Sequence, residues 1–599
     1  MAFDRSAFVW DPFLADLDGL DVITDRSQRL KLSQDYYHFS PVLQPQLQDV
    51  IADVVVRATT EAEVLQVARA CVSHGVPLTV RGAGTGNYGQ AMPLEGGVVL
   101  DLSTMNQILW LRPGLACVEP GVKIAALDRE ARPLGWEMRM APSTYRTATI
   151  GGFIGGGSGG LGSINYGFLS DRGNLCAVRV VTMEPEPRVL ELRGDAVQQV
   201  NHAYGTNGII TALEIPLAPA YPWAEVMVSF GDFMAAARFG QRLGDGDGLV
   251  KKLVCVCAWP IPNYFAALKR YIPEGQPIAL VLIAEQSLEL FRELVQESGG
   301  KICYEKSALE AEKGVSLAEH SWNHTTLHAR SVDPSLTYLQ TVFPADPQLK
   351  LVEHMYHHFG DEVPMHLEFI RLQGQTIAAG LQLVRYSTPE RLQEIIDYHE
   401  ARGAMIFDPH TYILENAGRK VVDPRHLAFK QEMDPQGLLN PGKMRSWQSK
   451  NASLASNSDS TPDSTTPDLA APSDSDPQPT PQSRWDQADR NWQAAQLLHH
   501  QGFYDVAMTR AYYAMFYVVD ALLRSQQLFC TSHDERLGLL RHHLVASGEV
   551  PPELADHLEF ALEERCAADY TSQEMPDQER ADRVLGLVPA FLALREEQC

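Results

Sequence analysis

Two glycine-rich segments contain the residues best suited to binding a ligand. The first, Arg81-Gly-Ala-Gly-Thr-Gly-Asn-Tyr-Gly89, directly follows a predicted strand, and the second runs from Ala148 to Gly162. Glycine permits positive φ angles and a close approach of the backbone, so successive N–H groups can converge on an anion. The two segments therefore predict a diphosphate ligand. The alternative is that both are loops that only turn the chain.

Each segment also contains a GxGxxG pattern, which begins at Gly84 in the first and at Gly157 in the second. In a Rossmann dinucleotide site a helix starts inside this pattern, and its N-terminus faces the phosphates. Here the first pattern leads through Pro93 into another predicted strand, and the second leads into residues 165–168, which show no helical character. We therefore reject the Rossmann interpretation.

The elements that must position these loops follow an α+β pattern. A predicted helix at Glu61–His74 precedes the first loop, with Thr60 and Glu63 at capping-box spacing, and predicted strands at Pro77–Arg81 and Val98–Asp101 flank that loop. After residue 222 the pattern fits a second α+β domain built on an antiparallel sheet. Its predicted strands and helices are Glu225–Phe230, Ile278–Ile283, Leu288–Glu297, Met365–Arg371 and Pro389–Arg402.

The composition limits the partners and the compartment. A net charge of −25 favours solubility and disfavours nucleic acid, whose phosphates attract basic surfaces. The nine cysteines include no CxxC pair, and Cys255-Val-Cys257 has the wrong spacing for a zinc ribbon or a thioredoxin-like site. With no signal peptide and no apolar run long enough to span a bilayer, we expect a cytoplasmic protein that is not an integral membrane protein.

Several motifs, taken in chain order, resemble the FAD-binding domain of the vanillyl-alcohol oxidase/PCMH superfamily. They are the strand before Arg81-Gly-Ala-Gly-Thr-Gly, then Pro142-Ser143, Thr149-Ile-Gly-Gly152 and Tyr204-Gly-Thr-Asn-Gly-Ile-Ile210-Thr. The closing Asp434-Pro-Gln-Gly-Leu-Leu-Asn-Pro-Gly-Lys443 resembles the C-terminal signature of the glycolate oxidase and D-lactate dehydrogenase branch. The resemblance implies an FAD-dependent oxidoreductase that transfers a hydride from a small 2-hydroxy acid to flavin N5.

The resemblance also implies how FAD is held. Backbone amides of both loops would bind the pyrophosphate, and Ile209 and Ile210 would lie near the flavin. Covalent members tether FAD through a histidine in the first loop, sometimes with a cysteine in the second, and neither residue is present here. We therefore expect non-covalent FAD. The expected cofactor-binding residues are Arg81, Gly82, Ala83, Gly84, Thr85, Gly86, Ser143, Thr149, Ile150, Gly151, Gly152, Gly159, Ile209, Ile210 and Asn440.

The implied reaction needs a base for the hydroxyl proton and a cation for the substrate carboxylate. The Glu-His-Gly-Ile-Gly motif that supplies a catalytic histidine in this branch is absent, and Phe407-Asp-Pro-His410-Thr-Tyr412 occupies the comparable region. We expect His410, with Tyr412 beside it, to be catalytic; the alternative is a structural histidine in a turn. Arg371 could clamp the carboxylate as a bidentate fork, or form a surface salt bridge.

A histidine pair offers a second candidate. His324 and His328 lie four residues apart on one face of a predicted helix and could bind substrate or metal, so His324 joins the expected catalytic residues. His366 and Glu368 are candidates for further ligands. Because the sequence fixes no third ligand, we expect no metal.

The last part of the chain resembles a HEPN domain, a small helical bundle that often dimerises. The resemblance rests on Thr509-Arg-Ala-Tyr-Tyr-Ala-Met-Phe-Tyr517 and on Arg565-Cys-Ala-Ala-Asp-Tyr570. Nuclease versions carry a histidine shortly after the arginine, and Arg565 lacks one. Residues 485–599 contain nine arginines, no lysine and nineteen acidic residues, a balance unfavourable to RNA. We expect an interaction module, through which the chain could form a homodimer, with the aromatic stripe in its core rather than stacked on RNA.

Together these patterns predict an α+β fold: a two-subdomain PCMH-type FAD-binding domain with an α+β cap domain, and an all-α helical bundle after a disordered linker. The expected domains are an N-terminal extension (1–46), the FAD-binding domain (47–221), the cap with an FAD-contacting end (222–447), the linker (448–483) and the HEPN-like domain (484–599).

The sequence leaves the electron acceptor and several functions open. One alternative is an oxidoreductase of the same fold that acts on a sugar-type alcohol. Another is a flavin-binding sensor or scaffold that has lost catalysis and signals through the HEPN-like domain. A third is a HEPN ribonuclease regulated by flavin.

Overall fold

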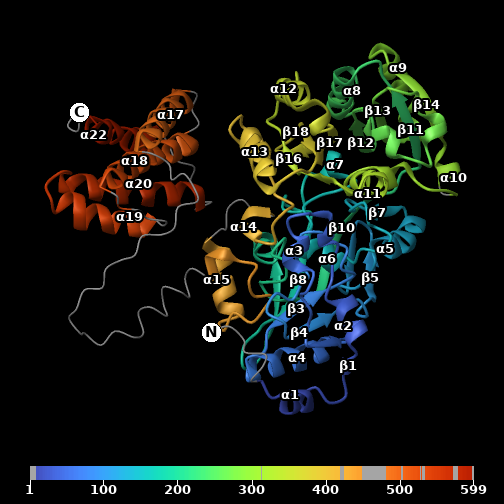
Figure 1. The fold of residues 1–599 in the computed structure, drawn as a ribbon, viewed down its shortest axis with the longest axis horizontal. Coiled ribbons are helices and arrows are strands. Elements are labelled where there is room, and N and C mark those ends of the chain that lie inside the picture. The colour runs from blue at the N-terminus through green and yellow to red at the C-terminus, as the bar shows by residue number, and fades with distance from the viewer. Residues whose placement is uncertain are drawn as a thin grey trace. The chain divides into compact units, whose positions relative to one another are not determined.

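The fold was obtained as a computed structural model of the chain, shown in Figure 1. It describes residues 8–311, 313–417, 424–447, 481–500, 504–526, 528, 533–570 and 578–595. The chain divides into two compact units, one up to Thr461 and one from Pro462. The predicted linker, residues 448–483, lies outside the described residues except for 481–483, which begin helix α17 (Pro481–His500).

The first unit begins with a four-stranded sheet in the order β1-β2-β4-β3, in which β2, β4 and β3 run parallel. Helix α4 (Glu61–His74) has the predicted bounds, and its apolar residues Val64, Val67, Ala68 and Cys71 are fully buried. The Thr60 hydroxyl accepts a hydrogen bond from the Glu63 N–H, and the Glu63 carboxylate accepts one from the Thr59 N–H. The other elements here are α1 (Trp10–Asp16), β1 (Asp21–Ile23), α2 (Arg26–Leu32), α3 (Gln44–Leu47), β2 (Val54–Arg57), β3 (Leu78–Arg81) and β4 (Val98–Asp101).

A second sheet of six strands completes what we call the N-terminal lobe, residues 8–221. Its path is β5-β6-β10-β8-β9, and β7 pairs with the far end of the long strand β10. Helices α5 and α6 pack on it through buried aliphatic side chains. The elements are β5 (Ile108–Arg112), β6 (Leu115–Val118), α5 (Ile124–Ala131), β7 (Trp136–Met138), α6 (Ile150–Gly156), α7 (Ser163–Tyr166), β8 (Ala177–Val181), β9 (Val189–Arg193) and β10 (Ile209–Pro219).

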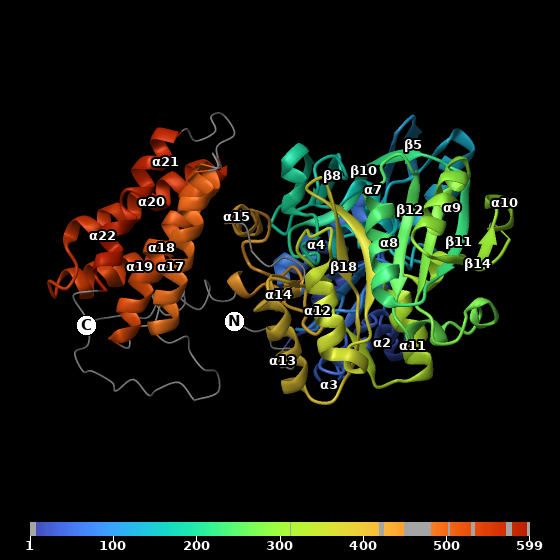
Figure 2. The ribbon, with the colours of Figure 1, turned by 90° about the horizontal axis from the view of Figure 1, so that it is seen from above.

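The cap, residues 222–417, is built on an eight-stranded sheet in the order β14-β11-β13-β12-β17-β18-β16-β20. Figure 2 shows α8, α9 and α12 along this sheet. The strands are β11 (Trp223–Ser229), β12 (Lys251–Cys257), β13 (Ile278–Ala284), β14 (Lys301–Lys306), β16 (Thr341–Val342), β17 (His366–Leu372), β18 (Gln375–Gly380) and β20 (Met405–Ile406), and β15 (Leu336–Tyr338) pairs with β19 (Leu383–Arg385). The helices are α8 (Phe233–Asp245), α9 (Leu288–Glu297), α10 (Ala308–Ala311), α11 (Asn323–Val332), α12 (Lys350–Phe359), α13 (Pro389–Glu400) and α14 (Leu414–Ala417).

The two faces of the cap sheet have different partners. Along β12, Val254 and Val256 pack in the core shared with α8, α9, α12 and α13. Cys255 and Cys257 point to the other face, where the core cluster also includes Tyr88 of the N-terminal lobe. Side chains alternate along a strand, so this face joins the cap to the N-terminal lobe. Helix α15 (Pro424–Met433) then leads the chain back to the N-terminal lobe.

The second unit is a helical bundle with its own core, built around α18 (Tyr504–Ser525). Tyr512 is buried and the other aromatic residues of the stripe are partly buried against that core, as predicted. The Asp520 carboxylate forms ion pairs with Arg484, Arg524 and Arg536 at 2.7–2.9 Å. The remaining helices are α19 (His533–Leu539), α20 (Pro552–Tyr570), α21 (Gln578–Leu585) and α22 (Val588–Ala593), with a π-helical turn at Leu540–Val545.

Candidate functional site

A cavity of about 790 Å³ is lined by the N-terminal lobe and by the cap. Both glycine-rich segments line it, with residues 82–86 and 155–159. The cap contributes residues around His324, at the start of α11, and around Gly380, at the end of β18. The volume lies within the range of roughly 300–1,000 Å³ that is typical of small-molecule sites.

The first glycine loop is held at both ends. Arg81 ends β3, and its guanidinium donates hydrogen bonds to the carbonyls of Gln34 and Ala83, which ties the loop to the N-terminal segment. A Cβ at Gly82 would lie 2.1 Å from Thr149 Oγ1, so only glycine lets the two segments touch at this point. Residues 82–86 belong to no strand or helix, so their N–H groups are available to a bound anion.

The second glycine segment corrects one prediction. Ser163–Tyr166 form the one-turn helix α7, although we expected no helical character at residues 165–168, and Ile150–Gly156 form helix α6, for which we made no prediction. Thr149 caps α6, because its hydroxyl accepts a hydrogen bond from the Gly152 N–H at 3.3 Å. Burial of Ile150, Phe153 and Ile154 stabilises a helix that its glycines alone would disfavour. Helix α6 ends where the second GxGxxG pattern begins, so the Rossmann interpretation stays rejected.

The structure brings most of the expected cofactor-binding residues to one cavity. Ile150 and Ile209 do not line it, because their side chains are buried in the cores of the two sheets. Asn440 does not line the cavity either, and its side chain donates hydrogen bonds to backbone carbonyls of residues that do. The residues that line it are Arg81, Gly82, Ala83, Gly84, Thr85, Gly86, Ser143, Thr149, Gly151, Gly152, Gly159 and Ile210.

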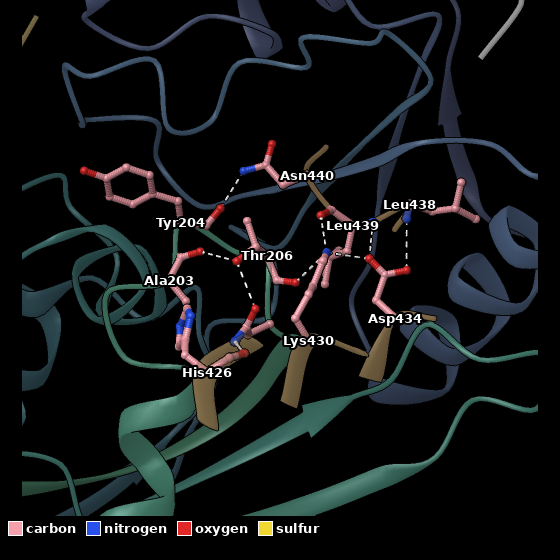
Figure 3. A network of polar contacts seen from close by, with 10 residues as sticks. Ala203, Tyr204, Thr206, His426, Lys430, Asp434, Leu438, Leu439 and Asn440 are labelled. Atoms are coloured by element: carbon pink, nitrogen blue, oxygen red, sulfur yellow. Dashed lines mark hydrogen bonds and ion pairs between the residues drawn. The ribbon is translucent and has the colours of Figure 1, made fainter. Parts of the chain in front are cut away.

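The closing segment contacts the backbone at Tyr204 and Thr206, as Figure 3 shows. The Asn440 side-chain amide donates to the carbonyls of Gln90, at 2.9 Å, and Tyr204. Lys430 and Asp434 form a buried ion pair at 2.5 Å, and the lysine also donates to the carbonyl of Thr206 at 2.9 Å. This segment therefore positions the backbone that lines the cavity.

Three of the four expected catalytic residues do not line the cavity. His410 is buried, with Nε2 3.0 Å from the Tyr338 carbonyl and Nδ1 2.8 Å from the Ser40 hydroxyl. A carbonyl can only accept, so Nε2 carries the proton and Nδ1 accepts from Ser40. Burial lowers the pKa of His410. These contacts fit the structural alternative better than the role of a base.

Tyr412 and Arg371 are also occupied elsewhere. Tyr412 packs beside Gly89, with the Lys443 ammonium 5.1 Å from the centre of its ring. Arg371 forms an ion pair with Asp247 at 2.5 Å and donates to the Gly374 carbonyl at 3.1 Å. The arginine therefore follows the salt-bridge alternative.

His324 is the expected catalytic residue that lines the cavity, and it belongs to a polar group that the sequence did not reveal. Its Nδ1 lies 3.1 Å from one oxygen of Glu319, and the other oxygen of Glu319 lies 2.8 Å from Arg146 Nε. All three residues line the cavity. Burial raises the pKa of Glu319, but the hydrogen bond and charge of His324 and the charge of Arg146 outweigh it and hold that pKa below its ordinary value. Glu319 is therefore ionised at neutral pH.

The arrangement has the parts of an acid–base site. A carboxylate that orients an imidazole through Nδ1 leaves Nε2 to exchange protons with a substrate. The Arg146 guanidinium is about half exposed and holds Glu319 through Nε, which leaves its terminal nitrogens for a substrate carboxylate. The only sequence signal for this group was the run Glu319-His-Ser-Trp-Asn-His324, since Arg146 is far away in the chain.

The N-terminal segment also reaches the cavity, although its sequence gave no sign of a site. Asp35 lines the cavity and is buried, and burial raises its pKa to about 6 despite the opposing charge of Lys443. Burial lowers the pKa of Lys443 to about 7. The residues expected to form an extension are therefore part of the cavity wall.

Two family models match the chain. Residues 52–191 match the FAD-binding domain, and residues 482–598 match the HEPN domain. In the C-terminal unit, 92 residues are 37% identical to the UPF0332 protein glr0978 of Gloeobacter violaceus, which covers 15% of this chain and 73% of that protein.

The N-terminal half is similar to oxidoreductases. It is 30% identical over 193 residues to the glycolate oxidase subunit GlcD of Escherichia coli strain K12, which covers 31% of this chain and 38% of that protein. It is 31% identical over 181 residues to the D-lactate dehydrogenase of Anaerostipes hadrus, with 28% and 37% covered. The chain spans less than half the length of the curated oxidoreductases that it matches.

Solved structures share the fold. An alkyldihydroxyacetonephosphate synthase superimposes with a TM-score of 0.55 at 16% identity, over 74% of this chain and 88% of that one. Among the described residues, the helices are all too short or too polar to cross a lipid bilayer.

Proposed function

Because the chain belongs to the FAD-binding domain family through residues 52–191 and to the HEPN family through residues 482–598, we propose that it is an FAD-dependent oxidoreductase that oxidises a small 2-hydroxy acid. The single observation that carries the proposal is the shared cavity. Two touching glycine segments line one part of it, and His324, Glu319 and Arg146 line another. The names of the similar proteins, a glycolate oxidase subunit and a D-lactate dehydrogenase, support this substrate class.

The residues present fit FAD. The two glycine segments are in close contact at Gly82 and Thr149, where a Cβ on Gly82 would meet the Thr149 side chain. The backbones of both segments line the cavity, and their N–H groups would hold the pyrophosphate. Neither segment contains the histidine or cysteine of a covalent tether, so FAD would be held without a covalent bond. When bound, FAD supplies a hydride acceptor.

A histidine of the cap would take the proton, and an arginine of the N-terminal lobe would bind the carboxylate. Glu319 holds His324 through Nδ1, so Nε2 takes the hydroxyl proton of the substrate as its carbon is oxidised. Arg146 binds the substrate carboxylate by charge-assisted hydrogen bonds while Glu319 fixes its Nε. A sugar-type alcohol, the alternative substrate class, has no carboxylate for Arg146.

The experiment is a flavin spectrum of the purified full-length protein, followed by anaerobic mixing with D-lactate, glycolate and a neutral sugar-type alcohol. We expect yellow protein, flavin that is released by acid precipitation, and bleaching by a 2-hydroxy acid. Arg146→Gln should weaken the apparent affinity for that acid about tenfold to a hundredfold. Arg371→Gln is the matched control, because Arg371 is paired with Asp247 outside the cavity lining.

The outcomes separate the alternatives. Colourless protein that takes up no FAD contradicts the whole proposal. Bleaching by the sugar-type alcohol alone, unaffected by Arg146→Gln, favours the other substrate class. Flavin that no alcohol reduces favours the sensor or scaffold, in which the HEPN domain carries the function.

For the HEPN domain we propose a role in self-association in the cytoplasm. Residues 485–599 carry ten more acidic than basic residues, which opposes binding to RNA. We expect the full chain to be a dimer by light scattering, and a chain ending at residue 447 to be a monomer. RNA cleavage that requires residues 485–599 would favour the ribonuclease alternative instead.

A further inference from the structure

Two neighbouring strands of the cap place four metal-ligand side chains on one face of the sheet. Strands β12 and β17 are antiparallel, with Cys255 opposite Glu368 and Cys257 opposite His366. Residues two apart on a strand share a face, and directly opposed residues are neighbours across the ladder. The spacing Cys255-Val-Cys257, which does not fit a zinc ribbon, is therefore the spacing that a strand needs to present both thiols together.

The two cysteines and His366 meet in the interior, with their ligand atoms all within 4.8 Å of one another. The Cys255 and Cys257 sulfurs lie 3.8 Å apart, and Cys255 Sγ lies 3.4 Å from His366 Nε2. His366 Nε2 lies 3.0 Å from a carboxylate oxygen of Glu368. Both cysteines and His366 are fully buried, and Glu368 is 1% exposed. Polar groups of this kind are costly to bury unless they are paired or coordinate a cation.

The hydrogen bonds of His366 leave its Nε2 directed at the centre of this group. Its Nδ1 lies 3.2 Å from the Leu381 carbonyl, which can only accept, so Nδ1 carries a proton. In the neutral ring Nε2 then offers a lone pair, and it faces the Glu368 carboxylate and the Cys255 sulfur. A metal ion satisfies all of these groups, and the bond from Nδ1 to a carbonyl is the usual support of a metal-bound histidine.

We propose that Cys255, Cys257 and His366 bind a thiophilic divalent metal ion of the zinc type, with Glu368 beside His366. At a zinc–sulfur distance of about 2.3 Å, two sulfurs of a tetrahedral site lie about 3.8 Å apart, and a sulfur and a histidine nitrogen lie about 3.6 Å apart. The distances in the cap are 3.8 and 3.4 Å. Binding releases the two thiol protons, so two thiolates and a neutral imidazole coordinate the ion, and the Glu368 carboxylate lies beside the imidazole.

This site differs from the histidine pair that the sequence suggested. His324 is paired with Glu319, and His328 stacks on His320 with its Nε2 2.9 Å from the Glu319 carbonyl. The prediction that no metal is bound rested on the lack of a third ligand for that pair. Strands β12 and β17 supply a different set of metal ligands, and its two cysteines were not among the ligands that the sequence suggested.

The proposed ion would lie directly behind the cavity wall. Glu368 accepts a hydrogen bond from the Trp322 N–H at 2.7 Å, and His366 binds the Leu381 carbonyl. Trp322 and Leu381 both line the cavity, whereas the three proposed ligands and Glu368 do not. Trp322 also has a positive φ of 52°, which a non-glycine residue adopts only when its surroundings hold it. We assign the ion a positioning role for this part of the wall, next to His324.

The test is the metal content of the full-length protein, with its flavin content measured on the same sample. We expect about one zinc per chain after anaerobic purification or reconstitution with Zn²⁺, and sulfur scatterers at about 2.3 Å in X-ray absorption at the zinc edge. Substitution with Co²⁺ should give thiolate-to-cobalt charge transfer and the visible bands of a tetrahedral site. These readouts are independent of catalysis, so they can succeed or fail whatever the substrate is.

Matched variants locate the ion. Cys257→Ala and His366→Ala should lower the affinity for zinc at least tenfold and remove the cobalt bands. Cys303→Ala, on the same sheet but outside the cluster, should keep them. The proposal is wrong if the wild-type protein takes up no Zn²⁺ or Co²⁺ under reducing, anaerobic conditions. It is equally wrong if Cys257→Ala retains the full metal content and the cobalt spectrum.

Discussion

The two walls of the cavity are built in different ways. The N-terminal lobe lines it with the backbone of two glycine segments, whereas the cap contributes ionisable side chains such as Glu319 and His324. Each segment of the glycine wall is recognisable from glycines that lie close together in the chain. The cap wall depends on which distant segments the fold brings together, because Glu319 meets Arg146 from the N-terminal lobe. In the proposed function, the first wall would bind the cofactor and the second would select the substrate.

The largest effect should come from breaking the glycine wall. In Gly82→Val the new side chain would meet Thr149 Oγ1, 2.1 Å from the Cβ position, and would force the two segments apart. We expect FAD affinity to fall by at least about a hundredfold, or about 2.7 kcal/mol. The measurement is a fluorescence titration of flavin-free protein with FAD.

The control for this change is Gly231→Ala, where a Cβ meets no atom within 4 Å. It should bind FAD like the wild type. Normal FAD binding by Gly82→Val would mean that contact between the two segments is not what shapes the cofactor site.

The next effect tests the cap wall. His324→Ala removes the proposed base, and the rate of flavin reduction should fall about 10²- to 10⁴-fold while FAD stays bound. His410→Ala is the matched comparison, because both nitrogens of His410 are already hydrogen-bonded away from the cavity lining. It should mainly lower the melting temperature. Stopped-flow measurement of flavin reduction in both variants distinguishes the two histidines. Slow reduction in His410→Ala together with fast reduction in His324→Ala would mean that His410, and not His324, is the base.

A third prediction uses the pH dependence of stability to probe the cap. Burial lowers the pKa of His320 to about 4, against 6.5 for an unperturbed histidine. The folded cap therefore holds His320 neutral, and the unfolded chain takes up a proton first as the pH falls from 6.5 towards 4. Over that window His320 should reduce the free energy of unfolding by up to about 3 kcal/mol.

Thermal unfolding between pH 4 and 7 measures this contribution. His320→Phe should make the melting temperature of the first unit less dependent on pH. His357→Phe, on the exposed side of α12, should leave that pH dependence unchanged. Identical profiles for the wild type and His320→Phe would show that the buried ring is not responsible for the acid sensitivity.

Much of the fold followed from local signals. The bounds of α4 and β4 were predicted to the residue, because capping at Thr60 and a short run of β-branched residues act over a few positions. The FAD-binding domain and the HEPN domain are confirmed by the matching family models. Helix α6 was missed, since its glycines argue against a helix and burial of Ile150 and Phe153 overrides them.

The cap site could not be predicted to the same extent. His410 and Arg371 looked reactive in sequence, but their partners Ser40 and Asp247 lie 370 and 124 residues away in the chain. Cys255-Val-Cys257 was compared with loop-based metal motifs, whereas it lies on a strand whose partner supplies His366. A residue type indicates what a side chain can do, and only the tertiary contacts show whether it is free to do it.

The closing segment has a consequence for how the protein is made. Asn440 and Lys443 donate to backbone carbonyls of Gln90 and Gly89, and Leu438 joins Leu78 at the edge of the first sheet. A growing chain on the ribosome therefore lacks the supports of its first glycine loop until some 350 further residues have been synthesised. Cofactor loading should follow synthesis of the whole first unit, and premature termination before this segment should yield protein without flavin.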